Sequence, residues 1–168
     1  KPDFENARIH SCSVCYQGEE TIAFPWAGEA VNVMRELLRS PCPKIASNMK
    51  FEERWTRCTL KTPVRNWVWD TMQAAHIVDN RPGVTSVKFQ SFALLGSDAW
   101  NDHIEEFLSE KGKDGLNRIQ EIDTGDLLLY NGLDSLLEWK VAEKQFELLD
   151  FPVPKGLYKK KGAEYEDL

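Results

Sequence analysis

The sequence lacks any apolar run long enough to span a bilayer. Its first ten residues, KPDFENARIH, also lack the apolar stretch of a signal peptide. We therefore expect a protein that does not enter membranes and that works in the cytoplasm. The first residue is Lys rather than Met, so we expect the chain to be a fragment or a processed piece of a longer protein.

Cysteines are few and do not form a recognisable metal-binding set. The four are Cys12, Cys15, Cys42 and Cys58, and only the first two form a C-x-x-C pair. No second pair or Cys/His cluster completes a zinc site. We expect reduced, mostly buried thiols, as in cytoplasmic proteins, and keep a zinc or redox role of the C-x-x-C pair as the alternative.

Basic residues are fewer than acidic ones. The chain has 21 Lys and Arg against 27 Asp and Glu, which gives a formal net charge of -6. This balance argues against tight, sequence-independent binding of duplex nucleic acid, which favours a strongly basic surface. It does not exclude a metal-dependent nuclease, because clustered carboxylates hold the cations that bridge to phosphate. No phosphate-binding Gly-rich loop or serine nucleophile elbow is present.

The 168 residues suit one domain with one sizeable core. Hydrophobic spacing predicts a hairpin from strands 7–16 and 21–24, with a turn at residues 17–19. It further predicts helices at 28–40, 49–60, 70–80, 86–96 and about 126–149, strands at 44–47 and 67–69, and short helices around 104–108 and 116–122. This order predicts an α/β domain over residues 1–150, with a mixed sheet flanked by helices. Residues 151–168, rich in Pro, Lys and Gly, are expected to be a linker or a docked extension outside the core.

Three segments place polar side chains where they could meet. In SNMKFEERW, Asn48 takes the N-cap position of a helix and Glu52 follows one turn later. Asp70 lies between a strand and a helix, and LLYNGLDSLLEW carries Tyr130 and Asp134 four residues apart. Carboxylates from two helices can share a hard divalent cation, and a nearby phenol can orient or deprotonate water. Each pattern alone also has a structural interpretation, as a helix cap or a buried tyrosine.

Taken together and in this order, the segments resemble the 3′–5′ exonuclease domain of family A, phage-type DNA polymerases. This domain belongs to the DEDD exonucleases with a tyrosine in the third motif. The second motif of that family is N-x-K-[FY]-D, the third is Y-x-x-x-D, and a W/F-D-T-M segment lies between them. The matching residues here are Asn48, Lys50, Phe51 and Glu52, then Trp69 to Met72, then Tyr130 and Asp134. The resemblance spans about residues 7–150.

The resemblance implies a fold, an activity and partners. It implies an RNase H-like sheet and a proofreading exonuclease that removes nucleotides from single-stranded or frayed DNA 3′ ends with two divalent cations, Mg²⁺ or Mn²⁺. It also implies a polymerase domain in the parent chain, in the cytoplasm of a bacterium or a phage-infected host.

The resemblance also assigns roles to residues. Asp134 would be a metal ligand, Glu52 would hold the second metal through water, and Tyr130 would orient the attacking water. Asn48, Lys50 and Phe51 would support the site or contact the substrate.

Two departures from the family pattern leave other functions open. Glu52 stands where the family has aspartate. The first motif, an acidic D-x-E on an apolar strand, is matched in letters only by Asp3 and Glu5, so we expect that strand to lie upstream of Lys1. One alternative is therefore a catalytically inactive module of the same fold that holds DNA or has a structural role. Another is an RNase D-like exonuclease that acts on RNA.

Overall fold

The computed structural model describes residues 2, 7–109 and 117–157. Its strands are β1 (Ser11–Tyr16), β2 (Glu20–Pro25), β3 (Lys44–Ala46) and β4 (Trp67–Asp70). Its α-helices are α1 (Glu29–Arg39), α2 (Met49–Leu60), α3 (Thr71–Val78), α4 (Val87–Leu95), α5 (Glu105–Leu108) and α6 (Thr124–Leu148). A 3₁₀ turn at Ile119–Glu121 precedes α6. The predicted α/β class is confirmed.

The strands form two small sheets rather than the one mixed sheet that we expected. β1 pairs with β2 in an antiparallel hairpin, and β3 pairs with β4 in parallel. Within the described residues no strand lies between β1 and β3 to join the two pairs. The parallel and antiparallel halves of the expected sheet are therefore present but separate.

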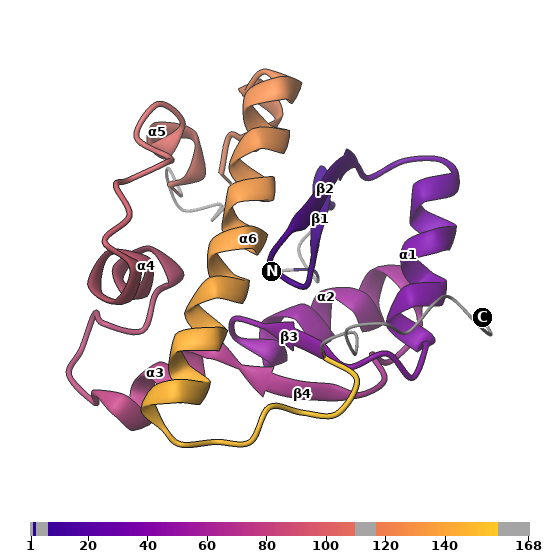
Figure 1. Cartoon of the computed structure of the whole chain (residues 1–168). Helices are drawn as coiled ribbons and strands as arrows, with labels where there is room; N and C mark the ends of the chain where they lie inside the picture. Colours follow the sequence, from indigo (N-terminus) through magenta and orange to yellow (C-terminus); the bar gives the residue numbers. More distant parts are fainter. Residues whose placement is uncertain (1, 3–6, 110–116, 158–168) are drawn as a thin grey trace.

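Helix α6 runs through the middle of the molecule and organises the other elements around it (Figure 1). The β1–β2 hairpin lies on one side of α6, while α4 packs on the other. The β3–β4 pair and α3 lie toward the C-terminal end of α6. Residues on α6 can therefore meet side chains from both sheets and from the α4–α5 region.

The hairpin turn shows why the sequence has glycine at position 18. Gln17 and Gly18 both have positive φ, 54° and 71°, and the amide of Glu19 donates to the Tyr16 carbonyl at 3.2 Å. A Cβ on Gly18 would lie only 2.7 Å from Cδ1 of Trp139 on α6. Glycine is needed here for the backbone conformation and for the close approach of the hairpin to α6.

Two hydrophobic clusters stabilise the fold. The larger joins one face of α6 to β4, α3 and the C-terminal segment, and consists of Trp69, Ala74, Trp139, Ala142, Phe146 and Leu157. The smaller contains Leu38, Leu60 and Val64 and joins α1, the end of α2 and the segment before β4. Since Leu157 is only 4% exposed and belongs to the larger cluster, residues 151–157 dock on the core, which corresponds to the docked extension among the two expected alternatives.

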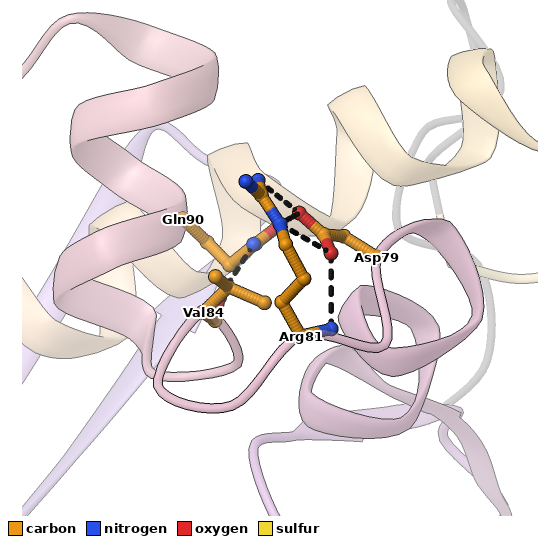
Figure 2. A network of polar contacts seen from close by, with 4 residues as sticks. All are labelled: Asp79, Arg81, Val84 and Gln90. Atoms are coloured by element: carbon orange, nitrogen blue, oxygen red, sulfur yellow. Dashed lines mark hydrogen bonds and ion pairs between the residues drawn. The ribbon is translucent and has the colours of Figure 1, made fainter.

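The connection between α3 and α4 is held by local polar contacts (Figure 2). The Arg81 guanidinium bonds both carboxylate oxygens of Asp79, with a shortest distance of 2.6 Å. The buried Gln90 amide of α4 donates to the Val84 carbonyl at 2.7 Å. These contacts fix the start of α4, and through it the chain that continues toward α5.

The predicted helix boundaries are close to the observed ones, and those of α2 agree at both ends. Helix α6 begins two residues before the predicted start, because Asp123 accepts the Gly125 amide at 2.8 Å and caps the helix. The short helix expected around 116–122 is a 3₁₀ turn in its described part. Asp3 and Glu5, together with residues 158–168 of the tail, lie outside the described residues. None of the described helices combines the length and apolar character needed to cross a membrane.

Candidate functional site

Asp70 caps two helices at once. Its Oδ1 accepts the amides of Asn48 at 3.0 Å, Met72 at 3.0 Å and Gln73 at 3.3 Å, and its Oδ2 accepts the amide of Met49 at 2.9 Å. Its carboxylate thus satisfies the first amides of both α2 and α3. Both oxygens are committed to backbone donors, so Asp70 has a structural role in this arrangement.

Asn48 begins α2 as predicted, but its side chain does not cap the helix. It has a left-handed conformation, with φ 59° and ψ 60°, and it forms no side-chain cap hydrogen bond. Asparagine tolerates this conformation better than most residues. Asn48 therefore serves as the turn that brings the start of α2 against Asp70, and the cap itself comes from Asp70.

Asp134 lies in the middle of α6 and is held by two hydrogen bonds. The Trp100 indole Nε1 donates to Asp134 Oδ1 at 2.8 Å, and the Tyr130 hydroxyl, one turn earlier, also bonds the carboxylate. Burial raises the pKa of Asp134, while the bonds from Tyr130 and Trp100 and the charge of Lys88 oppose this rise. The side chain is thus partly desolvated and fixed in orientation.

Tyr130 is a neutral phenol at physiological pH. Burial raises its pKa well above the ordinary value, and the adjacent charge of Asp134 raises it further. A phenol in this state can donate or accept a hydrogen bond but does not act as a base near neutral pH. Of the two roles considered for Tyr130, orienting water is the one that its environment favours.

Glu52 projects from the first turn of α2. The residue as a whole is exposed, but protein crowds its carboxyl group, and this desolvation raises its pKa to about 7. The charge of Glu52 also contributes to the raised pKa of the Cys12 thiol on β1, after the larger effect of burial. The Glu52 carboxyl group is thus close enough to the hairpin to affect a thiol on β1.

Glu138 is a third acidic residue at this place, and the sequence prediction missed it. It lies one turn after Asp134 on α6, and the Thr71 hydroxyl donates to its Oε1 at 3.3 Å. Burial raises the pKa of Glu138 to about 8, and the charges of Glu52, Asp134 and, least, Asp70 add to the rise. The charges of Glu52 and Asp134 thus both act on Glu138, and we call these three residues the acidic group.

A sequence signal for Glu138 did exist. Tyr130, Asp134 and Glu138 follow one another at intervals of four residues, which places all three on one face of a helix. The next residue of the same stripe, Ala142, is buried. Extending the i, i+4 pattern from Asp134 by one more turn would have identified Glu138 as an acidic residue next to the core.

The other residues expected near the substrate lie on the outer side of α2. Lys50 is exposed, and Phe51 is 48% exposed with its ring edge-on to Trp55 at a centroid distance of 6.2 Å. Within the described part of the chain, neither side chain forms a hydrogen bond with the acidic group. Phe51 offers an aromatic surface to solvent, which suits base stacking but does not by itself indicate it.

The donor chemistry of the acidic group suits a hard divalent cation, but the group does not form a complete protein cage. Among the described residues no three His, Cys, Asp or Glu side chains come close enough together to hold a metal ion. Mg²⁺ commonly uses only one or two carboxylates and takes its remaining oxygens from water and substrate phosphate. Glu52 and Asp134 are therefore candidates for a partial site that needs further ligands.

Comparisons with protein-family models, with curated proteins and with solved structures give no match for this chain.

Proposed function

We propose that the chain is the 3′–5′ exonuclease domain of a DNA polymerase, with an RNase H-like fold, and that it hydrolyses phosphodiester bonds at DNA 3′ ends. The observation that carries this proposal is the Asp134 carboxylate on α6, which the Trp100 indole holds at 2.8 Å, and it is supported by the effect of the charges of both Glu52 and Asp134 on Glu138. The order of the motifs around Asn48, Asp70 and Tyr130 supports the same conclusion.

Each residue of the site would have a distinct task. Bound divalent cations would supply a polarised water and stabilise charge on the leaving oxygen. Asp134 would hold a cation through the oxygen sites that Trp100 and Tyr130 leave free. Tyr130, as a neutral phenol, would orient the attacking water, and Glu52 would hold the second cation through water.

We further propose that an acidic pair on an additional strand completes the site. Among the described strands, β1 has only β2 as a partner and β3 has only β4, so one edge of each remains unpaired. Unpaired edges accept extended segments readily. A strand that carries two carboxylates beside these edges would supply the missing ligands and join the two sheets. A longer parent chain or a second chain could contribute it.

The activity test uses a 3′-labelled single-stranded DNA with Mg²⁺ or Mn²⁺. Stepwise shortening from the 3′ end that requires the metal and is lost in Asp134→Ala supports the proposal. Because an incomplete site would be weakly active, the same assay is run on the parent polymerase. Absence of metal-dependent trimming in that parent contradicts the enzymatic function.

An inactive module of the same fold is the second candidate, and the state of the carboxyl groups favours it. A pKa of about 7 for Glu52 and of about 8 for Glu138 leaves much of this group protonated near neutral pH. Protonated carboxyl groups are poor cation ligands. Retained binding of single-stranded DNA without any trimming would identify this module. Matched DNA and RNA oligomers in the same assay would reveal an RNase D-like preference for RNA.

A further inference from the structure

The strongest contact to Asp134 from outside its own helix comes from a loop that the motif pattern does not include. Trp100 lies between α4 and α5, 34 positions before Asp134, and its Nε1 donates to Asp134 Oδ1 at 2.8 Å. This distance is in the range of charge-assisted N–H···O⁻ bonds. We propose that Trp100 is a positioning residue that fixes the Asp134 carboxylate for cation binding, an inference that rests on the proposed function.

The loop is well placed to hold the indole still. Asn101 and Ile104 follow Trp100 and are 3% and 2% exposed, and the Ile104 amide closes a turn on the Asn101 carbonyl at 2.9 Å. Helix α4, which leads into this loop, packs on α6. The Trp100 backbone is therefore anchored on its C-terminal side by buried residues, and its ring reaches α6 from there.

The bond determines which lone pairs of Asp134 remain available. An ionised carboxylate has about four acceptor sites, of which Trp100 takes one and the Tyr130 hydroxyl another. Two donors of this kind prevent free rotation of the carboxyl group and leave the remaining sites in a fixed direction. Outer partners of this type orient metal-binding carboxylates in other proteins and tune their affinity.

The charges around Asp134 are compatible with this role. Burial raises the pKa of Asp134, and the charge of Lys88 on α4, whose Nζ lies 3.7 Å from Glu105 Oε1, opposes this rise. Glu138 on the next turn of α6 faces the same region. The indole N–H is a neutral donor, so it can orient Asp134 without neutralising the charge that a cation needs.

The first experiment examines the bond in the metal-free protein. The six tryptophans give separate indole N–H signals in ¹H–¹⁵N NMR spectra, and the Trp100 signal is the one missing from Trp100→Phe. Asp134→Asn should shift that signal and speed its exchange with water while the other five stay in place. An indole signal that does not respond to Asp134→Asn overturns the proposal.

The second experiment measures Mn²⁺ affinity by electron paramagnetic resonance. Trp100→Phe removes the donor and keeps an aromatic ring, and it should weaken Mn²⁺ binding by about 10-fold. Trp67→Phe is the matched control, because it removes a similar indole bond to a carboxylate, from Nε1 to Glu53 Oε2 at 3.1 Å, away from Asp134. It should lower stability and leave Mn²⁺ affinity unchanged.

The outcomes separate this proposal from the proposed function. Equal Mn²⁺ affinity of Trp100→Phe and the unmodified protein would reduce Trp100 to a structural residue and leave the exonuclease proposal standing. If the unmodified protein binds no Mn²⁺ at all, both proposals fail. Weaker binding in Trp100→Phe, normal binding in Trp67→Phe and a Trp100 indole signal coupled to Asp134 would together establish the positioning role.

Discussion

Replacing Glu138 by Gln should stabilise the metal-free protein at alkaline pH and have little effect at acidic pH. Burial and the charges of Glu52, Asp134 and Asp70 raise the pKa of Glu138 from 4.5 to about 8. The folded protein therefore binds this proton more tightly than the unfolded chain. It follows that the free energy of unfolding decreases as the pH rises from about 5 to about 8. Gln is neutral throughout and still offers an oxygen to the Thr71 hydroxyl.

The size of the effect follows from the pKa difference. Each pKa unit corresponds to about 1.4 kcal/mol, so the full shift of the Glu138 pKa limits the gain in the free energy of unfolding to about 5 kcal/mol. Glu138 keeps some contact with solvent, and its titration is coupled to that of Glu52. Solvent screening and coupled titration therefore make the actual gain much smaller than this limit. We expect Glu138→Gln to be more stable than the unmodified protein by about 1–2 kcal/mol near pH 8.

Urea unfolding in the presence of EDTA measures this difference at several pH values. Glu36→Gln is the matched control, because Glu36 is exposed and lies on α1, outside the helices that carry the acidic group. It should follow the unmodified protein at every pH. If Glu138→Gln shows the same loss of stability with rising pH as the unmodified protein, the reasoning about a crowded acidic group is wrong.

Three further substitutions test the packing that positions the site, each by urea unfolding. Gly18→Ala should lose about 1–3 kcal/mol, because the added Cβ would lie 2.7 Å from Trp139 Cδ1, and an unchanged stability would mean that the hairpin does not approach α6. Asp70→Ala should lower the free energy of unfolding by about 2–4 kcal/mol, because it removes the acceptor of four backbone amides. A loss below about 1 kcal/mol would argue against a double cap. Gln145→Leu should lose about 1–3 kcal/mol, because it leaves the buried Trp69 Nε1, now 3.0 Å from Gln145 Oε1, without an acceptor, and a neutral result would contradict that bond.

The sequence predicted the elements well where one signal dominates the local conformation. The hairpin turn at residues 17–19 requires positive φ, and Gly18 supplies it. Helix α6 is 25 residues long and has a capping aspartate just before it. The separation of the strands into two sheets could not be predicted in the same way, because pairing depends on which strands are neighbours in space and not on local sequence.

The site was predicted only in part for a similar reason. Tyr130 and Asp134 were found because they share one helix face, and Glu138 extends that face by one more turn. Trp100 could not be found, since its bond to Asp134 joins positions 34 residues apart through a loop without periodicity. The cap of α2 was wrongly expected from Asn48, because the acceptor that replaces its side chain is Asp70, 22 residues later.

The most direct test of the central claim is a Mn²⁺ titration of the ¹⁵N-labelled protein followed by NMR. Bound Mn²⁺ broadens the signals of nearby amides even when binding is weak. If carboxylates of α2 and α6 face a common cation, small amounts of Mn²⁺ should broaden the amides around Glu52 together with those from Asp134 to Glu138. Broadening confined to one of these two segments, or confined to exposed acidic residues such as Glu105 and Glu106 on α5, would contradict the account.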